Sequence, residues 1–141
     1  MIFTFGSFRL DIDTAETKEL YAKTPLITET CSCDGCSNFM QAAKLFPPEV
    51  KEFFSSLGVD PEKAAEVYLT DPESRGKTAA YGGFYHLCGR ILEGTTDSSV
   101  WYTVSEGYRV YFTDDISLPE EGLKEPAIQM EVDFTRVPWV Y

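Results

Sequence analysis

Apolar residues recur at two different spacings in separate parts of this chain, and this separation constrains the fold more than any other feature. In residues 8–12, and again in residues 128–134, every second residue is apolar, which predicts half-buried strands. Between these segments Phe39, Ala43 and Phe46 recur at the spacing of one helix face. Strand-forming segments therefore flank a helical block.

The first half of the chain is expected to hold a hairpin followed by short helices. Gly6-Ser7 suits the two-residue turn of a hairpin between residues 2–5 and 8–12. Residues 14–23 are compatible with a helical turn, and residues 25–30 are expected to form a short strand. The expected helices begin at the cap Ser37, run from Pro48 to a stop at Gly58, and run from the cap Asp60 to about Tyr68.

The second half returns to the strand period after a loop at residues 70–79. In the strand expected from Tyr81 onward, residues 84, 86, 88 and 90 share one face. A hairpin over 100–104 and 108–113 follows, then an acidic loop at 114–125 and a last strand that Pro138 limits. Strands joined by short turns pair antiparallel, and helices set apart from them indicate an α+β fold.

We therefore expect one domain spanning residues 1–141. Its core should be an antiparallel twisted sheet of five or six strands, with two or three short helices inserted after the first strands. The helices are expected to cover one face of the sheet.

The charge of the chain disfavours several classes of partner. A net charge of −11, from 23 acidic and 12 basic residues, is repelled by nucleic acid and by the cytoplasmic leaflet of a membrane. The amino-terminal residues lack the pattern of a signal peptide, and no stretch has the length of a membrane span. We expect a soluble cytoplasmic protein, in which thiols stay reduced.

All four cysteines and the only histidine lie in two short clusters, residues 31–36 and 86–88. The spacing of Cys33 and Cys36 lets two sulfurs bind one ion through a tight turn, and zinc takes four ligands from thiolate and imidazole. If the sheet brings the clusters together, Cys33, Cys36 and Cys88 are three zinc ligands, with Cys31 or His86 as the fourth.

Other interpretations of the same residues stay open. Cys33 and Cys36 precede a helix, whose amino terminus stabilises thiolate, so a thiol redox enzyme is one alternative. The cysteines also fit ordinary buried thiols, and His86 fits a histidine bonded within the core. A nucleophilic pair of His86 with one of the cysteines lacks an orienting third group.

Aromatic residues are concentrated on the expected strands. An exposed aromatic face would provide a ligand-binding platform or a dimer surface, although packing in the core is the more frequent role of such residues. The residues concerned are Tyr81, Phe84, Tyr85, Trp101, Tyr102, Tyr108, Tyr111 and Phe112. The apolar tail at residues 137–141 is expected to pack back on the domain or onto a second subunit.

One resemblance covers most of residues 33–92. Cys33-x-x-Cys36-x-Asn38-Phe39, the run from Phe53 to Pro61 and Tyr81-Gly82-Gly83-Phe84-Tyr85-His86 resemble a group of small uncharacterised bacterial proteins. The resemblance implies a bacterial cytoplasmic protein and carries no activity. Taken together, the sequence favours a binding or interaction module over an enzyme, with a zinc site and a protein partner or a second copy as its binding partners.

Overall fold

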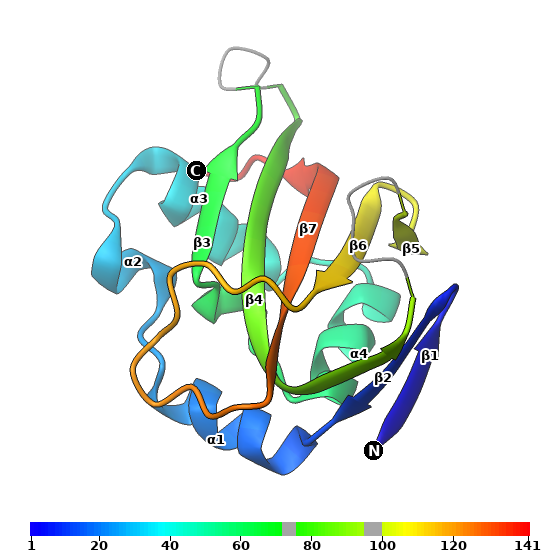
Figure 1. Cartoon of the computed structure of the whole chain (residues 1–141). Coiled ribbons are helices and arrows are strands. Elements are labelled where there is room, and N and C mark those ends of the chain that lie inside the picture. Colours follow the sequence, from blue (N-terminus) through cyan, green and yellow to red (C-terminus); the bar gives the residue numbers. More distant parts are fainter. Residues whose placement is uncertain (72–75, 95–99) are drawn as a thin grey trace.

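The computed structural model of the chain describes residues 1–71, 76–94 and 100–141 (Figure 1). Its strands are Ile2–Phe5 (β1), Phe8–Ile12 (β2), Glu66–Leu69 (β3), Thr78–Glu93 (β4), Tyr102–Ser105 (β5), Tyr108–Thr113 (β6) and Ala127–Pro138 (β7). Its helices are Thr14–Lys23 (α1), Ile27–Thr30 (α2), Asp34–Ala43 (α3) and Pro48–Leu57 (α4), with a 3₁₀ turn at Pro61–Lys63 (η1).

The long strand β4 organises one antiparallel sheet. The strand order is β1-β2-β4-β7-β6-β5, and β3 also pairs with β4. β7 runs along one edge of β4, whereas β3 and β2 share the other edge, at residues 81–84 and 89–93. Helices α3 and α4 lie behind the sheet in Figure 1, and residues 114–126, here named the crossing segment, pass in front of β4. The two faces of the sheet are therefore covered by different parts of the chain.

Helix α1 closes the part of the β4 edge that neither β2 nor β3 reaches. The backbone N–H of Cys88 donates to the Thr17 hydroxyl at 3.1 Å, and its carbonyl accepts from the N–H of Asp13 at 2.8 Å. Buried backbone groups need such partners, because an unpaired N–H or C=O costs free energy. The strand edge is thus satisfied by a helix instead of by another strand.

Aromatic side chains join the helices to the inner face of the sheet. Ring centroids lie 5.1 Å apart for Phe39 and Tyr81 and 5.0 Å apart for Phe54 and Tyr85. Tyr81, Tyr85, Tyr108 and Phe112 all belong to the buried hydrophobic cluster. Most of the strand aromatics are therefore core residues.

The outer face carries a small aromatic group near β6, apart from Phe84, whose ring centroid lies 5.7 Å from that of His86. Trp101 meets Tyr111 edge-on with the ring centroids 4.8 Å apart, and Arg109 lies 4.5 Å from the centre of the Trp101 ring. Arg109 also donates to Asp133 on β7 at 2.7 Å. These side chains therefore partner one another across β6 and β7.

The α+β class predicted from the sequence is confirmed. The described residues form seven strands and four helices, more than the five or six strands and two or three helices expected. The hairpins over residues 2–12 and 102–113 are present, and Gly58 ends α4 in the left-handed conformation. The compatible segment 14–23 is the full helix α1.

Three local predictions are wrong, and tertiary contacts explain the first two. Residues 27–30 form helix α2, because Ile27 is buried there and no strand lies alongside. Asp60 caps only the short turn η1, after which the chain joins the free edge of β4 as β3. The cap of α3 is Cys33, not Ser37. The loop expected at 70–79 lies partly outside the described residues, and β4 begins at Thr78.

Candidate metal centre

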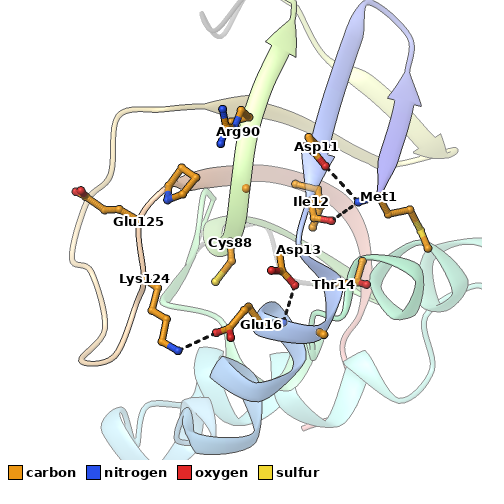
Figure 2. A pocket seen from close by; sticks show the side chains of 13 residues that line it. Met1, Asp11, Ile12, Asp13, Thr14, Glu16, Cys88, Arg90, Lys124 and Glu125 are labelled. Atoms are coloured by element: carbon orange, nitrogen blue, oxygen red, sulfur yellow. Dashed lines mark hydrogen bonds and ion pairs between the residues drawn. The ribbon is translucent and has the colours of Figure 1, made fainter.

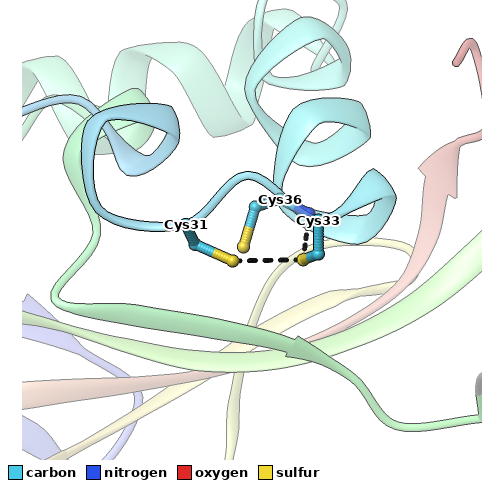
Figure 3. Close-up of side chains that lie close together, drawn as sticks. All are labelled: Cys31, Cys33 and Cys36. Carbon is cyan, nitrogen blue, oxygen red and sulfur yellow. Dashed lines mark hydrogen bonds between the residues drawn. The ribbon is translucent and has the colours of Figure 1, made fainter.

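Three cysteines converge where two helices meet. Cys31 is the carboxyl-terminal cap of α2, Cys33 is the amino-terminal cap of α3, and Cys36 lies in the first turn of α3 (Figure 3). Their sulfurs all lie within 4.8 Å of one another, and those of Cys31 and Cys33 are 3.1 Å apart. The three thiols are therefore close enough to hold one metal ion.

The first turn of α3 is fixed by contacts with the sheet. The hydroxyl of Tyr81 donates to the carbonyl of Gly35 at 2.7 Å, between the two cysteines of the turn. A Cβ atom at Gly35 would lie 3.3 Å from the Leu69 side chain, so only a small residue fits comfortably against β3. The cysteine turn is therefore held by β4 and confined by β3.

Asn38, fully buried one turn further along α3, ties the helix to the end of β7 and to the tail. Its amide nitrogen donates to the Tyr81 hydroxyl at 3.2 Å and to the Pro138 carbonyl at 3.0 Å. Its oxygen accepts from the backbone N–H groups of Val140 and Tyr141 at 2.7 and 3.2 Å. The apolar tail thus packs back on the same chain, and the site rests on ordered elements.

The three sulfurs differ in exposure. Cys36 is buried, Cys31 is half-buried and Cys33 is exposed. They line a surface hollow of about 410 Å³, whose opposite wall is residues 67–69 of β3. Asp34 is the charged residue of its lining. A ligand in the hollow therefore meets sulfur on one side and mostly apolar atoms on the other.

The local contacts shift the pKa values of the Cys31 and Cys36 thiols in opposite directions. Hydrogen bonds from the Cys36 thiol, from the backbone N–H of Cys33 and from the Cys33 thiol lower the pKa of Cys31. Burial raises the pKa of Cys36, and its hydrogen bonds to Cys31 and Cys33 raise it further. Charge on a buried sulfur is disfavoured unless a partner stabilises it. Cys31 is consequently the thiol most easily ionised of these two.

Cys88 lies in different surroundings (Figure 2). It is buried beside a hollow of about 560 Å³ that is also lined by Glu16 of α1 and Lys124 of the crossing segment. Burial raises the pKa of Cys88, opposed in part by the Thr17 hydroxyl and the backbone N–H of Lys124. Cys88 is not in the group of three cysteines whose sulfurs lie together.

His86 is committed to a buried polar network. Its Nδ1 faces a carboxylate oxygen of Glu120, and its Nε2 lies 2.9 Å from the side-chain oxygen of Gln129. That oxygen also accepts from the backbone N–H of Ser117 at 2.7 Å, while the amide nitrogen of Gln129 donates to Glu131. Both ring nitrogens therefore face acceptors, which fits a doubly protonated ring.

The charge of Glu120 outweighs the effect of burial on His86. Burial by itself lowers the pKa of a histidine. The pKa of His86 is nevertheless raised, by the hydrogen bond and the negative charge of Glu120 and, to a smaller extent, by hydrogen bonds with Gln129 and the Ser117 backbone. Both ring nitrogens are engaged by oxygen atoms of Glu120 and Gln129, so neither faces the cysteine cluster.

Register explains why the two clusters stay apart. His86 and Cys88 are two residues apart in an unbroken pairing with β7, so they share one face of β4. His86 meets the crossing segment on that face, whereas α3 packs behind the sheet (Figure 1). The shared face predicted for residues 86 and 88 is consistent with this register, and it is the face that α3 does not cover.

Sequence patterns did not point to the residues that position the site. Tyr81 and Gly35 are 46 residues apart, and no short-range spacing links them. The available signal was Asn38, a polar residue early in an amphipathic helix that proves to be fully buried. The sequence places Glu120 in an acidic loop and Gln129 in a strand, and no pattern in it indicates that either residue contacts His86.

Comparisons of the chain with protein-family models, curated proteins and solved structures found no match. None of the helices in the described part of the chain is long and apolar enough to cross a membrane.

Proposed function

We propose that this protein is a metal-binding interaction module that holds one zinc ion through Cys31, Cys33 and Cys36. The observation that supports the proposal is the approach of all three sulfurs to within 4.8 Å. Sulfurs bound to one tetrahedral zinc lie about 3.8 Å apart, given zinc–sulfur bonds of about 2.3 Å. The Cys31 and Cys33 sulfurs, 3.1 Å apart, would move slightly away from each other to reach that spacing.

The metal would add a cross-link between two helices that already meet through the hydrogen bond of Thr28 with Met40. Cys31 closes α2 and Cys33 opens α3, so an ion bound to both fixes the bend between them. Metal binding that exists only in the folded state adds to folding stability. The fourth position is left to water or to a donor from a partner protein or a second copy. A cytoplasmic location would keep the thiols reduced for this role.

The first experiment measures the zinc content of tag-free protein purified without chelator, and its reactive thiols before and after chelator is added. The expected result is about one zinc per chain, with thiols of the cluster unmasked by the chelator. Cys36→Ser should lose the zinc. The matched control Cys88→Ser removes another buried thiol and should keep it.

Two results would contradict the proposal. One is metal-free wild-type protein that takes up no zinc and whose thiol reactivity ignores the chelator. The other is equal loss of zinc from Cys36→Ser and Cys88→Ser when both variants remain folded by circular dichroism. The second result would return Cys88 to the ligand set.

A second candidate function is thiol–disulfide exchange, favoured by the lowered pKa of Cys31 and its 3.1 Å contact with Cys33. The Cys31 thiolate would attack a small disulfide and expel one thiol. Cys33 would then displace the second thiol, leaving a Cys31–Cys33 disulfide. A reversible disulfide formed with oxidised glutathione in metal-free protein, together with absence of zinc binding, would favour this function over the metal site.

A further inference from the structure

The ligand set at the cysteine site is three sulfurs and nothing else. The group of ligand atoms that lie together contains Cys31, Cys33 and Cys36, with no histidine or carboxylate among the described residues. His86 is engaged by Glu120 and Gln129 on the other face of β4. Zinc prefers four ligands, so it must recruit one from outside. A trivalent centre that makes three bonds and keeps a lone pair needs no fourth ligand.

Charge favours the same kind of occupant. Three thiolates carry three negative charges, so a divalent ion leaves one of them uncompensated and a monovalent ion leaves two. The lining of the hollow provides Asp34 as its charged residue, and the described residues place no lysine or arginine in it. An uncompensated charge beside the apolar side chains of Val67 and Leu69 is costly, because the medium there screens poorly. A trivalent centre with three thiolates is neutral.

We infer that this site binds a trivalent thiophilic metalloid, of which arsenite is the simplest form, in preference to a divalent ion. The inference rests on the proposed metal site and names its preferred occupant. Soft sulfur ligands select soft centres, and arsenic(III) meets that condition. Arsenous acid reacts with three thiols without any change of oxidation state. Three arsenic–sulfur bonds form, three arsenic–oxygen bonds break, and the three thiol protons leave with the three hydroxyl groups as water.

The graded exposure of the sulfurs gives a route for this reaction. Cys33 is exposed and Cys31 is half-buried, so the neutral acid reaches these two thiols from solvent. Cys36 is buried and supplies the third bond. Because arsenous acid is uncharged at neutral pH, the net charge of −11 does not repel it. Cys36 therefore distinguishes binding by three sulfurs from binding by the two more accessible thiols alone.

The test adds sodium arsenite to zinc-free, reduced protein and measures the adduct by native mass spectrometry after buffer exchange. The expected adduct has gained one arsenic and lost three hydrogens, and a tenfold excess of zinc over protein does not displace it. Cys36→Ser offers only two thiols at the site and should lose most of its arsenic on buffer exchange. Cys88→Ser should retain arsenic as the wild type does.

The outcomes separate the two proposals. Zinc that binds one to one and displaces arsenite would overturn this inference and leave the proposed zinc site standing. Arsenic retained equally by Cys36→Ser and wild type would overturn it as well, because two thiols would then suffice. Failure of both zinc and arsenite to bind the folded protein would overturn both proposals. Circular dichroism of each variant confirms that the protein tested is folded.

Discussion

The hydroxyl of Tyr21 forms two hydrogen bonds with the backbone of His86, donating to its carbonyl at 2.9 Å and accepting from its N–H at 3.1 Å. Tyr21 belongs to α1, and its side chain stands at the β4 edge between the segments paired with β3 and β2. A single phenol thereby replaces two ladder hydrogen bonds of a missing strand. Its loss leaves a buried donor and a buried acceptor without partners.

Tyr21→Phe is therefore expected to reduce the free energy of unfolding by about 1–3 kcal/mol, the cost of unsatisfied buried groups. Zinc affinity should stay unchanged, because Tyr21 makes no contact with the cysteine turn. Urea unfolding and a competitive zinc titration measure the two effects.

Tyr81→Phe is the matched variant for the same pair of measurements. It removes the hydroxyl that donates to Gly35 and accepts from Asn38, so it should weaken zinc binding as well as stability. If both tyrosine variants changed zinc affinity equally, Tyr81 would have no positioning role at the site.

The ion pair of His86 and Glu120 predicts a pH dependence of stability. The pKa of His86 is raised in the folded protein, so its contribution is fully present below the unfolded pKa of about 6.5. That contribution is lost as the pH rises through the folded pKa. Relative to His86→Gln, the wild type should lose stability above about pH 6.5, with a slope below about 1.4 kcal/mol per pH unit.

Urea midpoints at several pH values from 6 to 9 provide the measurement, and the difference between the two proteins cancels the titration of the cysteines. Glu120→Gln should flatten the dependence, because it removes the charge that keeps the ring protonated. The neighbouring Glu131 has a pKa raised by burial, so its own contribution also falls as the pH rises, beginning near its ordinary value. If the free energy of unfolding of the wild type, relative to His86→Gln, rose with pH above 6.5, the assignment of a charged His86 ring would be wrong.

Two glycines with positive φ differ in what surrounds them. A Cβ atom at Gly58, with φ of 82°, would lie 2.7 Å from the backbone oxygen of Thr14, whereas at Gly122, with φ of 91°, it would meet nothing within 4 Å. Gly122→Ala should cost about 1 kcal/mol, the penalty of the left-handed conformation. Gly58→Ala should cost at least about 1 kcal/mol more, because α1 and the end of α4 must move apart.

Thermal unfolding of the two alanine variants compares these costs directly. Equal losses of stability in the two variants would mean that α1 adjusts freely beside Gly58. The close approach of Gly58 to Thr14 would then add nothing to the cost of the substitution.

Local sequence signals were reliable where the residue itself imposes the geometry. Gly58 ends a helix because only glycine readily adopts the left-handed cap, and Gly6-Ser7 turns a hairpin for a similar reason. The spacing of Cys33 and Cys36 indicated that their thiols meet, because two residues separate them in one turn. Signals failed at residues 25–30 and 60–68, where a buried side chain or an open strand edge outweighed local preference.

The sequence by itself determined the class of the fold, the helix stop at Gly58, the hairpin turn at Gly6-Ser7, and the alternation that puts His86 and Cys88 on one strand face. These follow from backbone geometry within a few residues. Only the tertiary structure decided that this face meets the crossing segment while α3 packs behind the sheet. Which layer covers which face depends on contacts between residues 34 or more positions apart, such as those of His86 with Glu120 and Tyr81 with Gly35. The cysteine site is therefore built from Cys31, Cys33 and Cys36, and Cys88 belongs to another part of the molecule.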